Sequence, residues 1–500
     1  MTPRKDQRSN SIDISPEQFR KLGHETIDRI ADHLSSLTTR EITPGESPSQ
    51  VRKVLGNSGM PNQGTDPGVL LRDTTEMLME HSLFNGHPNF FGYITSSASP
   101  IGAFGDLLAA AVNANVGSFQ LAPIATEMEA QTIRWIAEMI GYPTECGGLL
   151  VSGGNMANFA CFVAGRKAMV EWDVRKFGLG GVQRRSFRIY ASTETHTWLQ
   201  KAVDVCGFGT EAIRWIPTDG KQCMDVQALR RQLTADQESG DVPLMVIGSA
   251  GTVSTGAIDP LGAIAEVCRE YKLWFHVDGA YGGFAAMLPD APEALKALRH
   301  ADSVAVDPHK WLYTPLEAGA VLVRDPARLR DAFSYHPPYY QFGSDEVDRP
   351  INYYEMGPQN SRGFRALKVW LGLKHIGREG YEKLLTEDIE LAHSLFELIS
   401  DHDEFEAFSH SLSITTFRYV PMDMRSQAHS SMEYLNKLNT ELLRRLQKGG
   451  EVYLSNAVIE DKFLLRACIV NFRTTLQHIR ALPEIVVSTG RVVDQEFRRQ

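Results

Sequence analysis

Four segments of the sequence place polar side chains directly after short runs of apolar residues. The run "SVAVDPHKW" carries Lys310, "LWFHVDGA" carries Asp278, and "RIYASTETH" ends at His196. The fourth segment, "GLLVSGGN", ends in two glycines and an asparagine, and helix-forming residues follow it. A lysine amine can bind a carbonyl group covalently, and a glycine turn at the start of a helix can bind a phosphate through free backbone N–H groups.

Each of these features also has an ordinary explanation. A lysine after a strand is usually a solvated loop residue, and a glycine turn often does no more than begin a helix. The histidine could be structural, and the aspartate could cap a helix. Together, however, they predict a site for pyridoxal phosphate. In that site Lys310 holds the cofactor as a Schiff base, Asp278 pairs with the pyridine nitrogen, and His196 lies against the ring.

These polar residues can meet only if the apolar runs before them are strands of one sheet. Most of the runs are apolar along their whole length, which is typical of strands buried on both faces. Helical segments separate many of them, which predicts crossover connections and a largely parallel α/β sheet. Ligands bind beyond the carboxyl ends of such strands, where these polar residues lie. The predicted strands are 148–152, 188–192, 213–217, 244–249, 273–277, 303–306 and 319–323.

Two further regions flank the predicted sheet. Near the N-terminus, Ser15 and Pro16 carry the signature of a helix start, and apolar residues then recur at helical spacing. Near the C-terminus, a long predicted helix at 381–400 precedes "SITTFRYV" and "FLLRACIVNFR", which predict a small α+β domain. We therefore expect an N-terminal helical segment, a large α/β domain with the cofactor site, and the small domain. They span residues 1–99, 100–378 and 379–500.

The composition argues against several classes of partner. The 500 residues carry a formal net charge of −10 with a pI near 5.9, and no basic cluster offsets this acidity, which disfavours nucleic acid and anionic membranes. Six scattered cysteines without a C-x-x-C pair argue against disulfides or a zinc site. No signal-peptide core and no long uncharged apolar run is evident. We expect a cytoplasmic protein without a metal, nucleic-acid or membrane partner.

The same motifs resemble those of the pyridoxal phosphate-dependent group II decarboxylases, particularly the aromatic-L-amino-acid decarboxylases. "HVDGAYGG" is followed by "DPHKW", with Asp278 and Lys310 32 positions apart, and "HPNFFGYITSS" and "RGFRALKVWLGLKHIG" extend the likeness over nearly the whole chain. The resemblance implies an aspartate-aminotransferase-like fold of type I and decarboxylation of an L-amino acid to the amine and CO₂. It also implies a homodimer with active sites at the subunit interface, on which the N-terminal segment packs.

The resemblance also implies roles for residues around the cofactor. Lys310 resembles the Schiff-base lysine, Asp278 the partner of the pyridine nitrogen, and His196 the histidine stacked on the ring. The remaining cofactor contacts that it implies are Gly154, Asn155, Ser249, Ala280 and His309.

Two loops are implied to face the substrate. In "HPNFFGYITSS", Tyr93 and Ile94 are the predicted pocket residues, and the two phenylalanines before them are at least as consistent with core positions. An aromatic and apolar lining favours tyrosine, tryptophan, phenylalanine or their hydroxylated relatives over glutamate, which needs a buried cation. Residues 336–350 are predicted to form a lid. On it Tyr339 resembles the proton donor that yields amine, although adjacent Tyr340 leaves the register open by one residue.

The sequence departs from the family pattern at two places. Animal members of the family have asparagine where this chain has Asp307, and a carboxylate there would repel a phosphate dianion. We therefore do not assign Asp307 to the phosphate site. The phosphate loop is Gly-Gly-Asn where relatives often have serines, so more of the phosphate contact must come from backbone N–H groups.

Several alternatives stay open at this point. An aminotransferase of the same fold needs an arginine for the substrate carboxylate, which the sequence does not exclude. A cysteine desulfurase needs a nucleophilic cysteine on a late loop, whereas the last cysteine, Cys468, stands in an apolar run. A glutamate decarboxylase, an aldehyde-forming decarboxylase-oxidase and a non-enzymatic scaffold are the others. Lys310, Asp278 and His196 argue against the scaffold.

Overall fold

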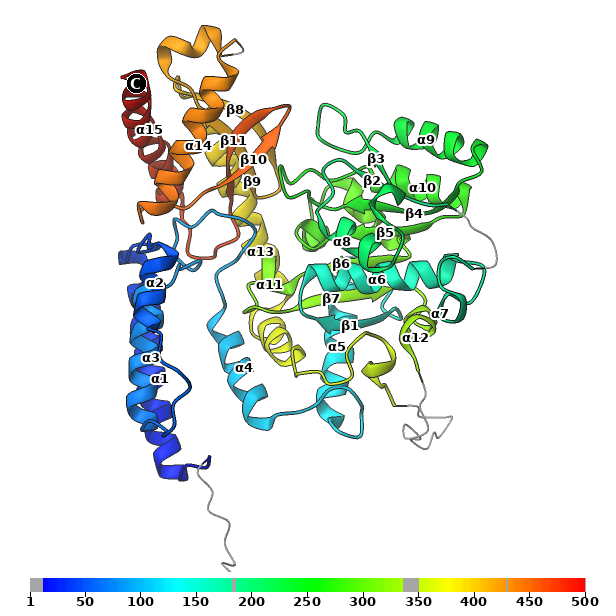
Figure 1. Cartoon of the computed structure of the whole chain (residues 1–500), viewed down its shortest axis with the longest axis horizontal. Helices are drawn as coiled ribbons and strands as arrows, with labels where there is room; N and C mark the ends of the chain where they lie inside the picture. Colours follow the sequence, from blue (N-terminus) through cyan, green and yellow to red (C-terminus); the bar gives the residue numbers. More distant parts are fainter. Residues whose placement is uncertain (1–11, 182–185, 336–349, 429, 500) are drawn as a thin grey trace, which may run out of the picture.

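The larger of two β-sheets positions the polar residues singled out above. In the computed structural model, which describes residues 12–181, 186–335, 350–428 and 430–499, this sheet has the strand order β1-β7-β6-β5-β4-β2-β3 (Figure 1). Every predicted strand is present, with ends that differ by up to two residues. The strands are β1 (Gly147–Val151), β2 (Phe187–Ser192), β3 (Ile213–Ile216), β4 (Val242–Ser249), β5 (Trp274–Asp278), β6 (Ser303–Val306) and β7 (Gly319–Val323).

The sheet is largely parallel, with one reversed strand. Strand β7 is antiparallel to both β6 and β1, whereas the pairs from β6 across to β3 are parallel. The chain between β6 and β7 contains only the short helix α11 (Pro308–Trp311), so it turns back instead of crossing over. The carboxyl ends of β1, β2, β4, β5 and β6 therefore share one edge.

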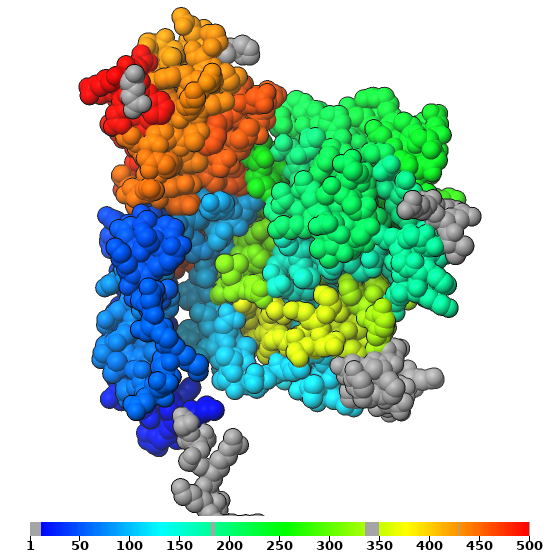
Figure 2. Space-filling view, viewed as in Figure 1, coloured from blue at the N-terminus to red at the C-terminus, as the bar shows by residue number. Residues whose placement is uncertain are grey.

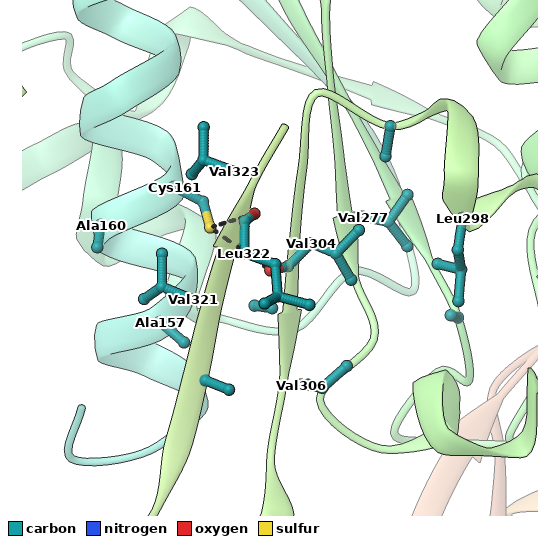
Figure 3. Close-up of a cluster of buried hydrophobic side chains, with 14 of the residues drawn as sticks. Ala157, Ala160, Cys161, Val277, Leu298, Val304, Val306, Val321, Leu322 and Val323 are labelled. Atoms are coloured by element: carbon teal, nitrogen blue, oxygen red, sulfur yellow. Dashed lines mark hydrogen bonds between the residues drawn. The ribbon is translucent and has the colours of Figure 1, made fainter. Parts of the chain in front are cut away.

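Helix α6 (Gly154–Met169) packs closely on this sheet. Small side chains, among them Ala157, Ala160 and Cys161, face β6 and β7, and the Cys161 thiol lies 3.8 Å from the carbonyl of Val304 (Figure 3). Each buried aliphatic side chain of such a core contributes about 1.5–3 kcal/mol. The other helices around the sheet are α5 (Pro123–Met139), α7 (Val174–Phe177), α8 (Trp198–Val205), α9 (Val226–Glu238), α10 (Leu261–Tyr271) and α12 (Ala327–Phe333).

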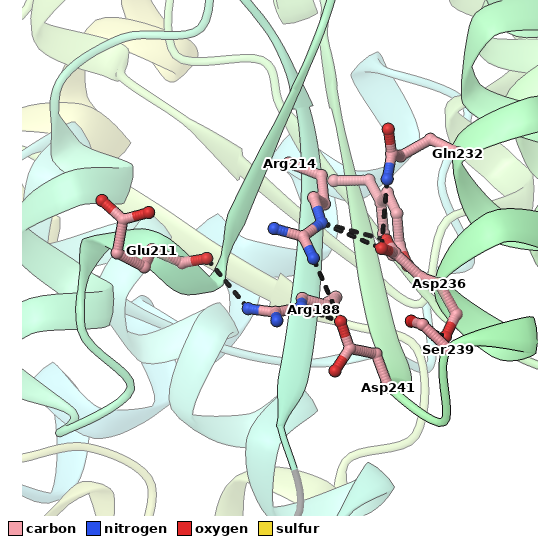
Figure 4. Close-up of polar contacts among 8 residues, drawn as sticks. Arg188, Glu211, Arg214, Gln232, Asp236, Ser239 and Asp241 are labelled. Carbon is pink, nitrogen blue, oxygen red and sulfur yellow. Dashed lines mark hydrogen bonds and ion pairs between the residues drawn. The ribbon is translucent and has the colours of Figure 1, made fainter.

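A polar cluster secures the outer edge of the sheet. Arg214, on edge strand β3, pairs with Asp236 of α9 at 3.0 Å and with Asp241 at 3.0 Å (Figure 4). Arg188 of β2 pairs with the same Asp241 at 2.6 Å. Asp236 is buried and also accepts a hydrogen bond from the Tyr190 hydroxyl. These contacts tie helix α9 to the edge strands, away from the residues predicted to bind the cofactor.

The second sheet belongs to the C-terminal part of the chain. It is antiparallel, with the order β10-β11-β9-β8, and helix α13 (Ala366–Ser400) runs from the large sheet to the small one. The predicted helix 381–400 is the second half of α13, which is interrupted at Gly377, near the predicted domain boundary at 378/379. The remaining elements are β8 (Phe405–Ser411), β9 (Ile414–Tyr419), α14 (Met432–Lys448), β10 (Ser455–Ile459), β11 (Lys462–Cys468) and α15 (Leu476–Arg498).

The N-terminal helices form a column along one side of the molecule (Figure 2). The predicted helix start is confirmed, because the Ser15 hydroxyl accepts a hydrogen bond from the Gln18 N–H at the start of α1. The apolar stripe of α1 is mostly uncovered, and Phe19 is 62% exposed. No helix in the described part of the chain combines the length and apolar character needed to cross a bilayer. The elements are α1 (Pro16–Ser36), α2 (Pro48–Leu55), α3 (Pro67–His81) and, nearer the body, α4 (Pro100–Val112).

Candidate active site

A cavity of about 410 Å³ lies at the edge where the carboxyl ends of the strands meet. Its wall includes the residues that follow β1, β2, β4, β5 and β6, as the open α/β sheet requires. Nine of the residues predicted to bind cofactor or substrate line it: Ile94, Gly154, Asn155, His196, Ser249, Asp278, Ala280, His309 and Lys310. Residues far apart in the sequence are thus brought to one place.

The turn between β1 and α6 forms a backbone cradle. Gly153 has φ 108°, which L side chains rarely adopt, and a Cβ there would lie 3.0 Å from the His309 ring. A Cβ on Gly154 would lie 2.5 Å from an Asp307 carboxylate oxygen. No side chain caps the start of α6, so its first N–H groups and the positive end of its dipole face the cavity wall. A phosphate group fits this cradle of glycines and free N–H donors.

Asp278, at the end of β5, has a fixed orientation. One carboxylate oxygen accepts a hydrogen bond from the Trp198 indole N–H at 2.7 Å, and the other accepts one from the Ala280 N–H at 3.1 Å. Trp198 was not predicted from the sequence as a site residue. These two donors hold the carboxylate at the cavity wall, where it can pair with a protonated ring nitrogen.

Three buried polar residues near Asp278, namely His276, Asn158 and Ser303, are joined by hydrogen bonds. His276, two residues earlier on β5, contacts Asn158 at 2.7 Å through Nε2 and Ser303 at 2.9 Å through Nδ1. Burial lowers the pKa of His276 to about 4, so this imidazole stays neutral. Alternate residues of a strand share a face, and this periodicity was the signal that could have grouped His276 with Asp278.

His196 stands on the loop after β2, at the cavity. Its Nδ1 accepts the Trp198 backbone N–H at 3.2 Å, which places the proton of the neutral ring on Nε2. Desolvation lowers the pKa of His196, and the negative charge of Asp278 opposes this shift. His196 therefore lines the cavity as a neutral ring with its proton on Nε2.

Lys310, in α11, faces a carboxylate that the sequence analysis set apart from the phosphate site. Its Nζ lies 3.2 Å from Asp307 Oδ2, and His309 Nε2 lies 3.7 Å from the same oxygen. Asp307 is fully buried, and no described residue donates a geometrically sound hydrogen bond to either of its oxygens. The structure thus places Asp307 in the cavity wall, next to the glycine cradle.

Ser249 and His309 hold their positions through backbone contacts. The Ser249 N–H donates to buried Asp259 at 2.8 Å, and burial raises the pKa of Asp259 to about 6. His309 Nδ1 lies 2.8 Å from the Ala318 carbonyl oxygen, just before β7, and burial lowers the pKa of His309. The backbone of Ser249 and the ring of His309 are therefore held in the cavity wall.

The two residues predicted to face the substrate lie in different surroundings. Ile94 lines the cavity, whereas Tyr93 does not; Tyr93 has φ 54° and its ring lies 6.2 Å from that of Tyr453. Phe90 and Phe91 are buried, in agreement with the core alternative for these residues. Tyr339 and Tyr340 lie outside the described residues.

Arg466 is a buried cation that the sequence analysis did not single out. From β11, its Nη1 donates to the Tyr93 carbonyl at 3.1 Å and to the Ser455 hydroxyl at 2.9 Å. Its Nε and Nη2 atoms have no hydrogen-bond partner among the described residues, although the side chain is fully buried. Unused N–H groups of this kind are rare inside proteins. The run "FLLRACIV" places a single arginine among apolar residues, which was the available signal.

Comparison with known proteins shows the family of this chain. The family model described as the pyridoxal-dependent decarboxylase conserved domain matches residues 48–420. An aromatic-L-amino-acid decarboxylase of Bacillus atrophaeus is 31% identical over 94% of this chain and 95% of its own length. A phenylacetaldehyde synthase of Petunia hybrida is 30% identical, with 93% of each chain covered.

A solved structure supports the same relationship. The crystal structure of Oryza sativa TDC with PLP and tryptamine superposes with a TM-score of 0.88 and 28% identity, covering 96% of this chain and 98% of that one. The fold-type-I architecture expected from the sequence is thereby confirmed. With a lysine, an oriented carboxylate and a phosphate cradle meeting at one cavity, the chain belongs to the pyridoxal-dependent decarboxylase family and is a pyridoxal phosphate-dependent carboxy-lyase.

Proposed function

We propose that this enzyme decarboxylates aromatic L-amino acids to the corresponding amines and CO₂. The observation that carries the proposal is the convergence of Lys310, Asp278 and His196 on one cavity, in a chain that matches decarboxylases over almost its whole length. The candidate substrates are tyrosine, tryptophan, phenylalanine and their hydroxylated relatives. Bound pyridoxal phosphate would supply an electron sink for the pair of electrons left on the substrate carbon when CO₂ departs.

The positions of the cavity residues support a role for each of them. Lys310 would hold the cofactor covalently, and Asp278, oriented by Trp198, would keep the ring nitrogen protonated. His196 would cover one face of the ring. The phosphate would lie at the start of α6, bound by backbone N–H groups of the glycine cradle together with Asn155, while Ser249, Ala280 and His309 would complete the wall.

The charge of the cavity wall supports an aromatic substrate over an acidic one. Among the residues described as lining the cavity, Lys310 is the only lysine or arginine, and it is committed to the cofactor. The second carboxylate of glutamate would need another buried cation. Ile94, which lines the cavity, would contact the aromatic side chain, whereas a contact from Tyr93 stays a prediction from the sequence.

Amine release, rather than aldehyde formation, depends on a proton donor. After CO₂ leaves, the substrate carbon must receive a proton before oxygen intercepts it. We assign this step to Tyr339, as the resemblance to the family implies. Tyr339→Phe should still release CO₂ but divert product to aldehyde, ammonia and peroxide, as coupled peroxide and amine assays would show. If only Tyr340→Phe forms aldehyde, Tyr340 is the proton donor. If neither variant forms aldehyde, the proton comes from another residue.

The enzyme is further proposed to be a cytoplasmic homodimer. Two apolar surfaces lie uncovered: the stripe of α1 and the face of α4 that carries Phe104, Leu107 and Leu108. Large contiguous apolar patches on a soluble protein often mark sites of contact with another protein. A second copy of the chain would cover both, and it would bring the partner's surface toward the cavity mouth near Ile94.

A substrate panel tests the proposed reaction. The purified protein should be yellow from bound cofactor, and it should release CO₂ from at least one aromatic L-amino acid. Stoichiometric amine separates decarboxylation from transamination, which would instead yield a keto acid. A panel in which glutamate or aspartate outperforms every aromatic amino acid would contradict the proposed substrate class without affecting the family assignment.

A further inference from the structure

Asp388 is a buried carboxylate that does not line the cofactor cavity. It stands in α13 and is only 3% exposed. Its Oδ2 atom accepts two hydrogen bonds, one from the Trp311 indole N–H at 2.8 Å and one from the Tyr313 hydroxyl at 2.6 Å. Both donors belong to the segment that directly follows Lys310. A single carboxylate oxygen thus holds the two aromatic residues next to the cofactor lysine.

The two aromatic residues are in turn packed against the site. The Trp311 ring stacks on that of Tyr281, with centroids 5.0 Å apart, and Tyr281 lines the cofactor cavity. Tyr313 has φ 53°, a left-handed conformation that needs support from its surroundings in a residue other than glycine. A further contact from α13, the Tyr381 hydroxyl, donates to the Leu312 carbonyl at 3.2 Å. The chain after Lys310 is therefore held by α13 at three consecutive residues.

Asp388 also lies where the two parts of the molecule meet. One turn before it, Leu385 belongs to the core of the large sheet; one turn after it, Ala392 belongs to the core of the small sheet. On its other side Asp388 faces a second cavity, of about 330 Å³, lined also by Asn471, Thr474 and residues of α13. Two of the three hydrogen bonds described between α13 and the lysine segment are thus made by this carboxylate.

We propose that Asp388 is a positioning residue for Lys310: it anchors Trp311 and Tyr313 and so sets the orientation in which the lysine presents its amine to the cofactor. The proposal rests on the proposed role of Lys310, and it concerns geometry rather than chemistry at the reacting atoms. An acceptor at position 388 is what the anchoring needs, so Asn, which keeps an acceptor oxygen without the charge, should replace Asp388, whereas Leu should not.

Three variants and one control test this inference in the full-length protein. Asp388→Leu removes the acceptor while keeping a branched side chain, Asp388→Asn keeps the acceptor, and Tyr313→Phe removes one of the two donors. Asp236→Leu is the matched control, because Asp236 is an equally buried carboxylate that accepts a tyrosine hydroxyl at 2.8 Å, but at the outer edge of the sheet. It should lower thermal stability without altering the lysine.

Two readouts separate positioning from stability. In the cofactor-free protein, the rate at which an amine-acylating reagent modifies Lys310 is measured by peptide mapping. In the reconstituted enzyme, the pH titration of the cofactor absorbance band and the separate values of kcat and KM are measured. Asp388→Leu should change the labelling rate, shift the titration midpoint and lower kcat about tenfold or more with little change in KM. Asp388→Asn should restore all three, and Tyr313→Phe should show a smaller change in the same direction.

These measurements distinguish failure of the positioning role of Asp388 from failure of the proposed enzyme function. If the wild type takes up no cofactor, the proposed function is contradicted, and the labelling of Lys310 still decides the present inference. If Asp388→Leu does not fold, Tyr313→Phe decides it. Unchanged labelling and titration in Asp388→Leu and Tyr313→Phe, or an equal shift in Asp236→Leu, would overturn the positioning role.

Discussion

At the scale of single residues, Lys310 and Asp278 carry the first prediction. Lys310 is the only lysine among the described lining residues, so Lys310→Ala should abolish turnover and covalent cofactor binding. Asp278→Asn should retain part of the cofactor but lose most activity, because the ring nitrogen is no longer held protonated. Borohydride reduction followed by peptide mapping should locate the pyridoxyl group on Lys310. A reduced adduct on any other lysine would contradict the assignment.

Asp307 should limit how tightly the cofactor binds. Its buried carboxylate lies beside the phosphate cradle, and it pairs with the Lys310 amine that the cofactor must engage. Asp307→Asn removes the charge at nearly constant volume, so we expect the cofactor to bind about tenfold more tightly, about 1.4 kcal/mol. Titration of the cofactor-free protein, followed by absorbance, measures this change.

Two controls test whether the gain in affinity comes from the phosphate group of the cofactor. Pyridoxal, which lacks the phosphate, should gain much less from Asp307→Asn. Glu317→Gln removes a carboxylate from the same cavity wall, but Glu317 is paired with Arg365 at 2.8 Å and is partly exposed, so it should change affinity little. Equal or weaker cofactor binding by Asp307→Asn would show that Asp307 does not oppose the phosphate.

The titration of Asp388 gives a prediction about stability. Burial raises the pKa of Asp388 to about 7, well above its value in an unfolded chain. The folded state therefore binds this proton more tightly, and the stability that the proton contributes is lost as pH rises from about 4 to about 7. Asp388→Asn cannot ionise. As pH rises across this range, its free energy of unfolding should therefore increase relative to that of the wild type, by up to roughly 2–4 kcal/mol. Urea unfolding at several pH values measures the difference, and a constant difference would contradict the shifted pKa.

The sequence could predict some of these residues but not the partners that hold them. Lys310, Asp278 and His196 follow apolar strands, and parallel strands bring their carboxyl ends together, so their meeting at one cavity was predictable. Asp388 and Arg466 give no such signal. Asp388 stands in an ordinary helical pattern, and its bonds to Trp311 and Tyr313 arise only when α13 packs against the lysine segment. The position of Asp307 beside Gly154 could not be predicted from the sequence, because the distance between them depends on the pairing of β1 with β7.

At the scale of elements, the junction of β1 and α6 carries the next prediction. Gly154 begins the helix, and a methyl group there would lie 2.5 Å from Asp307, so the cradle must open to admit it. We expect Gly154→Ala to weaken cofactor binding at least about tenfold while the fold is retained. Gly220→Ala is a matched control, since a Cβ there meets nothing within 4 Å. Cofactor titration and thermal unfolding of both variants, compared with wild type, would decide; unchanged affinity in Gly154→Ala would show that phosphate does not bind at this turn.

The strands themselves were predicted well, and the reversed strand was not. Runs such as "LMVIGS" are apolar along most of their length, which is typical of a strand buried on both faces. The direction of β7 leaves no trace in its composition, because a buried antiparallel strand is as apolar as a parallel one. Its direction follows from the short connection through α11, which also carries Lys310.

At the scale of the whole molecule, the uncovered apolar surface of α4 is the main feature that one chain cannot explain. Phe104, Leu107, Leu108 and Val112 recur at helical spacing, so they form one stripe, and each is about half exposed or more. The opposite side of α4 packs on α13, where a Cβ on Gly105 would meet Lys368. One face of this helix is therefore committed to the core, and the other is available to a second copy of the chain.

Leu108→Glu should therefore disrupt the proposed dimer. A charge placed in the centre of this stripe would be buried against the apolar surface of the partner, at a cost of about 2 kcal/mol or more per subunit interface. Light scattering coupled to size-exclusion chromatography should show a dimer for the wild type and a monomer for Leu108→Glu at the same concentration. Val205→Glu makes the same change at an exposed apolar residue of α8 outside this stripe, and it should stay dimeric. Activity should fall with the dimer, since the proposed site needs the partner's surface near Ile94. A wild-type monomer, or a dimer that both substitutions leave intact, would show that α4 is not the interface.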